Sequence, residues 1–294
     1  MSITHISVLL DESIALLDLQ PHEVIIDGTF GAGGHSKAIL AQGASDIRLV
    51  CVDLDEAAQA RYEAQIHDAR ATFVHTNFKD VETILKHVAV DHVHKVLLDL
   101  GTSTQQLLED TRGFSFASNT PLSMTFSKAG SHTGFTAADI VNTWSESSIA
   151  DIIYGYGEDS YARRIAKAIV ISREVTPIVT SRDLAAVIEQ AISRRGRLHP
   201  ATKTFQALRI AVNDELATIR TALDAWWSKL APGGRIAVIT FHSLEDRIVK
   251  QWMKAQVSGT ILTKKPIVPP DNELSINPRS RSAKLRGIEK ETTI

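Results

Sequence analysis

Residues 24–36 combine an acid with a glycine-rich turn, which suits the binding of a nucleotide-like ligand. The segment reads VIIDGTFGAGGHS, with Asp27 directly after a β-branched run and four glycines in the next seven residues. A β-branched run is typical of a buried strand, and glycines let the backbone turn tightly and approach a ligand closely. Residues 35–40 then predict the start of a helix. We therefore expect a strand, a loop and a helix in succession.

The loop residues distinguish three kinds of ligand. A phosphate-binding P-loop ends in Gly-Lys-Ser or Gly-Lys-Thr, whereas here Lys37 follows Ser36. The dinucleotide pattern GxGxxG lacks its last glycine, because Ser36 stands there. A carboxylate at Asp27 would repel a pyrophosphate but attract a cation, such as the ammonium and sulfonium of S-adenosylmethionine. Taken alone, the loop leaves open an adenosylmethionine site, a dinucleotide site and a turn without ligand.

Further acids follow the next apolar runs. Asp53 ends the run 47–52, about 20 residues beyond the loop, where an acid hydrogen-bonds ribose hydroxyls. Phe78 follows the run 71–74 and could cover an adenine, and Asp99 ends a fourth run. Because the carboxyl ends of parallel strands meet at one edge of a sheet, these positions predict an α/β, doubly wound fold with its ligand at that edge.

Length and composition indicate an ordinary globular protein. The chain has 294 residues, 44% hydrophobic and 22% charged, and can bury a large core. It has no apolar run of 18 residues, so we expect no membrane span. The first residues lack the cationic flank of a signal peptide, and we expect a cytoplasmic protein. Since Cys51 is the single cysteine, an internal disulfide and a cysteine-rich zinc site are excluded.

The net charge of −2 conceals an asymmetry. Residues 1–160 contain 9 Lys and Arg against 22 Asp and Glu, and residues 161–294 contain 23 against 12. The positive half has two basic clusters: Arg194, Arg195, Arg197, Lys203 and Arg209, and then Arg279, Arg281, Lys284, Arg286 and Lys290. Spaced basic residues are candidate phosphate contacts for RNA or DNA, and the alternative is a solvated basic face.

The order of the predicted elements suggests an insertion. Residues 101–134 are polar without periodicity, and helical patterns follow at 137–144, 148–154, 161–172 and 182–192, the last with Ser181 as its cap. We expect a mostly helical domain at 105–204, inserted into a sheet domain made of 1–104 and 205–294. In the resumed sheet domain, apolar residues at helical spacing predict one long helix over 208–230, then strands at 235–241 and 283–287.

Other catalytic constellations are weaker. His92 and His94, with His87 and Asp91 nearby, lack the paired spacing of a metal-binding helix, so no metal is expected. His242 follows the strand that ends at Phe241, which places it at the ligand edge of the sheet.

Several longer motifs together resemble the RsmH (MraW) family over residues 5–286. They are DGTFGAGGHS, VDLD, LLDLGTS, RGFSF, HPATKTFQALRIAVNDEL and FHSLEDRIVK. The resemblance implies a class I (Rossmann-like) S-adenosylmethionine-dependent methyltransferase with an inserted, mostly helical substrate-recognition domain. It also implies methylation of the exocyclic amino group of a cytidine in small-subunit (16S) ribosomal RNA, which tunes the decoding centre.

The same resemblance assigns roles to individual residues. Gly33, Gly34 and His35 would line the methionine end of the cofactor, and Asp53 would hold the ribose. The adenine side would be Phe78, with Asp99 and Gln106 completing the pocket; Asp27 and Gly31 join this set from the loop chemistry above. Asp99 is the first candidate to accept a hydrogen of the target amine and His242 the second. The RNA would contact the insert and the basic residues Arg194, Arg195, Arg197, Lys203, Arg209, Arg279 and Arg281.

The sequence departs from the family pattern at PLSMTF (121–126), where the family usually has PLDMRM, so that Ser123 and Thr125 replace an acid and an arginine. Three alternatives stay open. An amino-methyltransferase of DNA usually has Pro-Pro after the fourth strand, which the Leu and Gly following Asp99 do not match. The others are an NAD-dependent oxidoreductase and a non-catalytic RNA-binding or ribosome-assembly protein. The expected partner is the small ribosomal subunit, for a chain that is a monomer or a homodimer.

Overall fold

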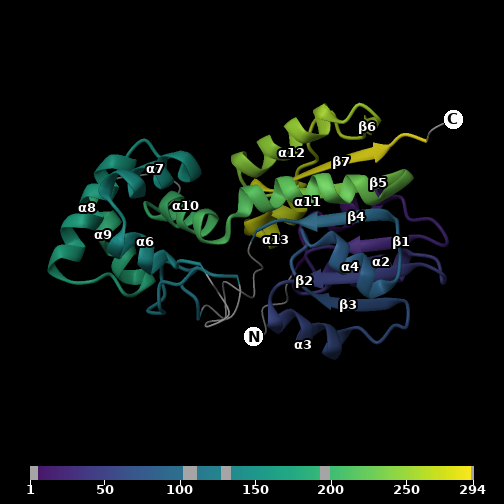
Figure 1. Cartoon of the computed structure of the whole chain (residues 1–294), viewed down its shortest axis with the longest axis horizontal. Coiled ribbons are helices and arrows are strands. Elements are labelled where there is room, and N and C mark those ends of the chain that lie inside the picture. The colour runs from purple at the N-terminus through teal and green to yellow at the C-terminus, as the bar shows by residue number, and fades with distance from the viewer. Residues whose placement is uncertain (1–5, 102–110, 127–133, 193–198, 293–294) are drawn as a thin grey trace. The chain divides into compact units, whose positions relative to one another are not determined.

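The computed structural model describes residues 6–101, 111–126, 134–192 and 199–292 (Figure 1). The chain forms two compact units: the first comprises Met1–Ser103 with Leu216–Ile294, and the second is Thr104–Glu215. Among the described residues, every helix is too short or too polar to span a bilayer.

The described part of the first unit forms a seven-stranded sheet in the order β3-β2-β1-β4-β5-β7-β6 (Figure 1). Strands β1 to β5 pair in parallel and β7 runs antiparallel to both β5 and β6. Their bounds are Val24–Asp27 (β1), Arg48–Asp53 (β2), Ala71–His75 (β3), Val93–Asp99 (β4), Leu230–Thr240 (β5), Gly259–Ile261 (β6) and Lys284–Lys290 (β7). The predicted doubly wound α/β fold is confirmed. Because β1 pairs with β2 on one side and β4 on the other, the strand order reverses there, and such a point opens a crevice at the carboxyl ends of the strands.

Each face of the sheet is buried under helices, because successive residues of a strand point to opposite faces. On β1, Ile25 packs with α1 (Leu10–Leu17), α2 (Gly34–Gln42) and α3 (Glu56–Gln65). Ile26 instead packs with α4 (Val81–Val88), α11 (Glu215–Lys229) and α12 (Ser243–Ala255). The short helix α13 (Asp271–Ile276) and the 3-10 turn η1 (Pro278–Ser282) precede β7.

The described part of the second unit is helical: α6 (Ala137–Thr143), α7 (Glu146–Gly157), α8 (Ala162–Val175), α9 (Ser181–Ala191) and α10 (Thr202–Asn213). These helices share one apolar core. The predicted helices at 137–192 are confirmed, with one correction at a cap. Thr180, not Ser181, caps α9, since its hydroxyl accepts the N–H of Asp183 while the Asp183 carboxylate accepts that of Thr180.

The prediction of one continuous helix over 208–230 is wrong. Helix α10 ends at Asn213, its C-cap Asp214 adopts the left-handed conformation with φ 48°, and α11 begins at Glu215. The apolar spacing persists across the break because Leu208 is buried in the core of the second unit and Ile219 in the core under the sheet. A periodic apolar pattern shows which residues are buried, but it does not show whether they are buried in one core or in two. For the same reason the second unit extends to Glu215, beyond the boundary at 204 that the sequence suggested.

Candidate functional site

The glycine loop after β1 is tied to the end of β2 by the chain itself. Gly31 and Gly33 have φ angles of 55° and 81°, a region that L side chains rarely adopt. The Gly31 N–H donates to Asp53 Oδ2 at 2.8 Å, and Arg61 Nε donates to the Gly31 carbonyl at 2.9 Å. Asp53, the candidate ribose ligand, therefore fixes the loop, with its Oδ1 accepting the N–H of Asp55 at 2.8 Å.

Packing within the protein requires glycine at two other loop positions. A Cβ at Gly34 would lie 1.9 Å from Ser7 Oγ, and one at Gly28 would lie 2.5 Å from Leu98 Cδ2. The sequence interpretation attributed all four glycines to tight turning and close approach of a ligand. At Gly28 and Gly34 the closely approaching groups belong to the same chain.

Asp27 lies beneath the loop rather than at its mouth, and is only 1% exposed. Its Oδ2 accepts the Ser36 hydroxyl at 2.6 Å and its Oδ1 accepts the N–H of Thr29 at 3.3 Å. Burial raises the pKa of Asp27 to about 6, partly offset by these bonds. Buried in this way, Asp27 can act on a bound cation through its charge and not through a direct hydrogen bond.

Asp99 ends β4 beside β1, at the point where the strand order reverses. Its backbone N–H donates to Thr29 Oγ1 at 2.6 Å, which ties the strand end to the loop. Its Oδ1 is buried and has no hydrogen-bond partner among the described residues. Burial raises the pKa of Asp99 well above its usual range, and the carboxylates of Asp27, Glu245 and Glu273 raise it further. An acid in these surroundings favours a proton or a cation next to it.

His35 is buried and faces Asp99. Its Nε2 lies 3.1 Å from the carbonyl oxygen of Val8. Because a carbonyl can only accept, Nε2 carries the proton, and Nδ1 of the neutral ring has a lone pair. Burial lowers the pKa of His35 to about 4, so the ring is neutral at pH 7. Nδ1 lies 3.8 Å from Asp99 Oδ2, so the two groups present acceptors to a common point.

His242 is the N-cap of α12. Its Nδ1 accepts the N–H of Glu245 at 3.4 Å, and its Nε2 lies 3.2 Å from Glu245 Oε1. The Glu245 carboxylate in turn accepts the backbone N–H of His242 at 3.2 Å, which completes a capping box, and also accepts the N–H of Phe241 at 2.8 Å. Since capping already uses the basic nitrogen of His242, the geometry favours Asp99 as the acceptor at this edge.

Phe78 follows β3 and lies next to the loop, since a Cβ at Gly28 would be 3.3 Å from the Phe78 Cβ. Trp226, fully buried, fixes it by donating its indole N–H to the Phe78 carbonyl at 2.9 Å. The predicted pocket residue Gln106 lies outside the described residues.

The candidate RNA contacts differ in how far their charges are already paired. Arg209 binds Glu215 with two hydrogen bonds of 2.7 and 2.9 Å, so its charge already has a partner within the protein, and its contact with RNA stays a prediction. Lys203 donates to a carbonyl at the end of α7 at 2.7 Å. Arg279 and Arg281 are exposed on η1. Three further candidates lie outside the described residues: Arg194, Arg195 and Arg197.

The rest of the second basic cluster is also engaged inside the first unit. Arg286 and Lys284 both bind Asp246, at 2.6 and 3.1 Å. Lys290 donates to two backbone carbonyls at the end of α11 and the start of β5, at 2.9 and 2.8 Å. Part of the positive charge of the second half of the chain is therefore engaged within the protein.

The residues that depart from the family pattern bind each other. Ser123 Oγ and Thr125 Oγ1 are 3.0 Å apart, and Thr125 is buried. Asn213 of α10 holds the same segment, accepting the N–H of Phe126 and donating to the carbonyl of Met124, both at 2.8 Å. Two hydroxyls thus form a neutral pair where the family usually has an acid and an arginine.

The sequence interpretation missed several residues that shape the site: Ser7, Thr29, Ser36 and Glu273. Most are short polar residues or acids in no periodic pattern, and Leu9, which Glu273 binds, is 264 positions away along the chain. Glu245 was expected near the ligand edge together with His242, because both follow the strand that ends at Phe241; its part in the capping box is what the structure adds.

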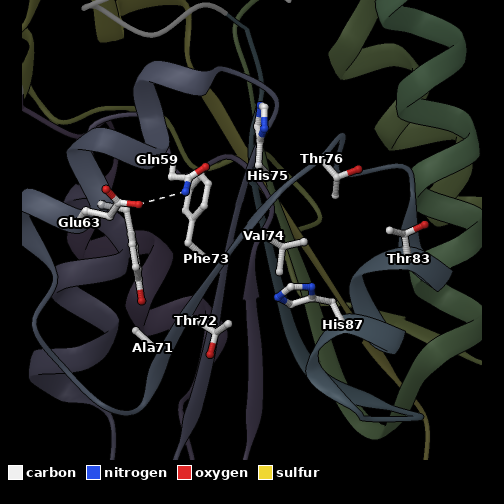
Figure 2. A pocket seen from close by; sticks show the side chains of 11 residues that line it. Gln59, Glu63, Ala71, Thr72, Phe73, Val74, His75, Thr76, Thr83 and His87 are labelled. Atoms are coloured by element: carbon white, nitrogen blue, oxygen red, sulfur yellow. Dashed lines mark hydrogen bonds between the residues drawn. The ribbon is translucent and has the colours of Figure 1, made fainter.

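A separate hollow of about 650 Å³ runs along the outer edge of β3. Figure 2 shows its lining, with Thr72, Val74 and His75 of β3 between Gln59 of α3 and His87 of α4. None of the predicted site residues lines it among the described residues, and β3 is an edge strand separated from β1 by β2. The candidate site is therefore the carboxyl edge of the sheet around Asp99, where the predicted site residues meet, and not this hollow.

Comparisons with known proteins agree with the motifs. A family model described as the MraW methylase family matches residues 2–291. A relative from Deinococcus deserti is 44% identical over 291 residues, covering 98% of this chain and 94% of its own. One from Geobacter sp. strain M21 is 43% identical over 309 residues (97% and 98%), and one from Clostridioides difficile strain 630 is 41% identical over 313 residues (99% and 100%). All three are named ribosomal RNA small subunit methyltransferase H.

Proposed function

Because the chain belongs to the MraW methylase family, we propose that it methylates small-subunit ribosomal RNA with S-adenosylmethionine as methyl donor. The target is the exocyclic N4 amino group of a cytidine, and the methylated base tunes the decoding centre. The observation that supports this proposal most directly is Asp99. A buried carboxylate oxygen without a partner among the described residues lies beside the glycine loop, with other acids close by.

The residues present fit the donor. S-adenosylmethionine supplies an electrophilic methyl group on a positively charged sulfonium. Asp27, Asp99 and Glu245 supply the negative field that such a cation needs, and their mutual repulsion falls when it binds. Asp53 would hold the ribose hydroxyls and Phe78 would lie against the adenine.

We assign Asp99 two functions towards the RNA base: it orients the cytosine amine, and it accepts a proton from that amine. The cytosine amine is a weak nucleophile, because its lone pair is delocalised into the ring, so it must be held in line with the methyl group. Such positioning contributes roughly 7–11 kcal/mol to catalysis. As the new N–C bond forms, the methyl–sulfur bond would break with its electron pair staying on sulfur, the amine would lose one proton, and Asp99 Oδ1 would accept that proton. The raised pKa makes the ionised carboxylate a better proton acceptor.

The target base must leave its stack to reach a crevice of this kind. Single-stranded RNA loops present unstacked bases at little cost, which fits a cytidine in a ribosomal RNA loop. The exposed Arg279 and Arg281 on η1 are candidate contacts for the flanking phosphates.

The test uses small ribosomal subunits from cells that lack this methyltransferase. We expect the full-length protein to transfer labelled methyl from S-adenosylmethionine to the RNA, and digestion with mass spectrometry to find the label in N4-methylcytidine. Label in another nucleoside would overturn the assignment of the target. Cofactor binding in calorimetry without any transfer would indicate an RNA-binding protein that retains its pocket, and binding of NADH instead would contradict the proposal altogether.

A further inference from the structure

Residues 6–9, which we call the strap, lie between the glycine loop and α13. On the loop side, the Val8 carbonyl accepts Nε2–H of His35 at 3.1 Å, and Ser7 Oγ occupies the space beside Gly34. On the other side, the Leu9 N–H donates to both carboxylate oxygens of Glu273, at 3.1 and 3.3 Å. The strap therefore connects the start of α2 to a helix near the end of the chain.

The backbone of the strap is in a conformation that its own residues do not favour. Leu9 is fully buried and has φ 50°, in the left-handed region that leucine rarely adopts. Such a residue persists only where its surroundings impose it. The Glu273 carboxylate binds the N–H of this residue, and Asn277 donates to the carbonyl of Ile6 at 3.2 Å. The strap is therefore held by two residues, Glu273 in α13 and Asn277 directly after this helix.

The strap also determines which nitrogen of His35 carries the proton. Without the Val8 carbonyl, the nearby Asp99 carboxylate would favour a proton on Nδ1, which faces it at 3.8 Å. With the carbonyl in place the proton stays on Nε2, and Nδ1 and Asp99 Oδ2 both present lone pairs to the crevice. Two acceptors that converge in this way suit a ligand ammonium.

We propose that Glu273 is a positioning residue for the cofactor: by holding the strap, it keeps His35 in the Nε2–H tautomer, with Nδ1 free to accept from the donor's ammonium group. This inference rests on the proposed function, because it assumes that the ligand in the crevice is S-adenosylmethionine. It also makes cofactor binding depend on a helix that no motif of the sequence connected with it.

Glu273 is itself one of the acids that face Asp99, so its charge and its contact with the strap must be separated. The matched variants are Glu273→Ala, which removes both, and Glu273→Gln, which removes the charge but keeps an oxygen for the Leu9 N–H. Asp271→Ala, an exposed acid on the same helix, is the control. The full-length variants are compared in S-adenosylmethionine affinity by calorimetry, in KM for the ribosomal subunit, and in the ¹⁵N shifts of the His35 ring, which report its tautomer.

We expect Glu273→Ala to bind S-adenosylmethionine about tenfold more weakly, as the loss of one charge-assisted hydrogen bond gives. Its His35 signals should move towards the Nδ1–H tautomer, while KM for the subunit is unchanged. Glu273→Gln should restore most of the affinity and the tautomer, and Asp271→Ala should match the wild type. If Glu273→Ala does not fold, Asn277→Ala removes the other hold on the strap and should shift the tautomer in the same direction.

A Gln variant as weak as the Ala variant would overturn the inference, since charge alone would then explain the effect. An unchanged His35 tautomer in Glu273→Ala would overturn it equally. A wild-type protein that ignores S-adenosylmethionine would instead refute the proposed function, and the tautomer measurement would still test whether Glu273 controls His35.

Discussion

The charged residues at the two ends of strand β4 have opposite surroundings: one has a partner of opposite charge and the other has neighbours of the same charge. Near the start, Lys95 is 2% exposed and its ammonium lies 3.1 Å from Glu23 Oε1, so a buried cation has a buried anion beside it. At the other end, Asp99 has carboxylates for neighbours and an oxygen that no described residue binds. One strand thus carries, within a few residues, a buried charge with a buried partner and a half-buried carboxylate whose Oδ1 is buried without a partner among the described residues.

The difference distinguishes a charge that serves the fold from one that serves chemistry. A buried pair is neutral as a unit, and breaking it is costly because the remaining partner stays buried. A half-buried acid among other acids has a perturbed pKa, which is typical of functional sites. The contrast predicts that substitutions at the start of β4 change stability without changing the site, and that substitutions at its end do the reverse.

The largest effect is expected at Asp99. We expect Asp99→Asn to slow methyl transfer by about 100- to 10,000-fold, the range of general acid–base contributions. Its free energy of unfolding should not fall, because the variant removes one of several carboxylates that repel each other. Single-turnover transfer of labelled methyl and urea denaturation measure the two quantities. If the variant is destabilised but transfers methyl at the normal rate, Asp99 serves the stability of the fold, as Lys95 and Glu23 do, and not the reaction.

The second largest effect is expected at the start of β4, where Lys95 and Glu23 form a buried ion pair. Lys95→Met should lower the free energy of unfolding by about 3–5 kcal/mol, because Glu23 is left buried without its partner. The double variant Lys95→Met/Glu23→Gln should recover most of this loss. Affinity for S-adenosylmethionine, measured by calorimetry, should match the wild type in both proteins. A clear loss of affinity would show that the two ends of β4 are not separable.

A third test uses pH at Asp27, a buried acid at the carboxyl edge whose oxygens do have partners. Its pKa is raised by burial from 3.8 to about 6, so the folded protein binds this proton more tightly than the unfolded chain. The contribution of Asp27 to the free energy of unfolding is therefore fully present below about pH 4 and is lost as the pH rises through about 6. The loss amounts to about 3 kcal/mol. Asp27→Asn lacks this dependence.

The quantity to measure is the difference in unfolding free energy between wild type and Asp27→Asn from pH 4 to 8. It should shift in favour of the variant by about 3 kcal/mol between pH 4 and 6 and then stay constant. His35 has the opposite dependence, since burial lowers its pKa to about 4, but it is common to both proteins and cancels. A difference that is flat over the whole range would mean that Asp27 is not the buried acid described above.

The smallest effect is expected at Asp53, whose two oxygens already bind backbone N–H groups of Gly31 and Asp55. Asp53→Asn keeps one acceptor and loses the charge, so we expect S-adenosylmethionine to bind about tenfold more weakly, and the free energy of unfolding to fall by about 1–3 kcal/mol because one backbone N–H loses its acceptor. Titration calorimetry measures the affinity. An unchanged affinity would remove Asp53 from the ribose role and leave it as a tie for the loop.

The sequence predicted the sheet well, because the strands around β1 are uninterrupted apolar runs that end in acids or turns. It also brought Asp53, Phe78 and Asp99 to one edge, since parallel strands share their carboxyl ends. It could not show that Asp27 lies beneath the loop. The position of this side chain depends on its hydrogen bond with the Ser36 hydroxyl, and no sequence pattern marks Ser36 as the partner of Asp27.

The failures have a common physical origin. The helix break at Asp214 leaves no trace in the apolar spacing, since both sides of the break are buried, each in a different core. The ion pair between Arg209 and Glu215 could likewise not be read from the sequence. Contacts between residues far apart in sequence, such as Leu9 with Glu273, are fixed by the whole fold and not by local propensity.

The ties between Gly31, Asp53 and Arg61 also bear on how fast the donor and its spent product can exchange. A loop already held in shape by its own chain has little conformational entropy left to lose when it is filled. Turnover then need not wait for this segment to fold and unfold, and the heat capacity change on binding should reflect only the apolar surface that the adenosine buries.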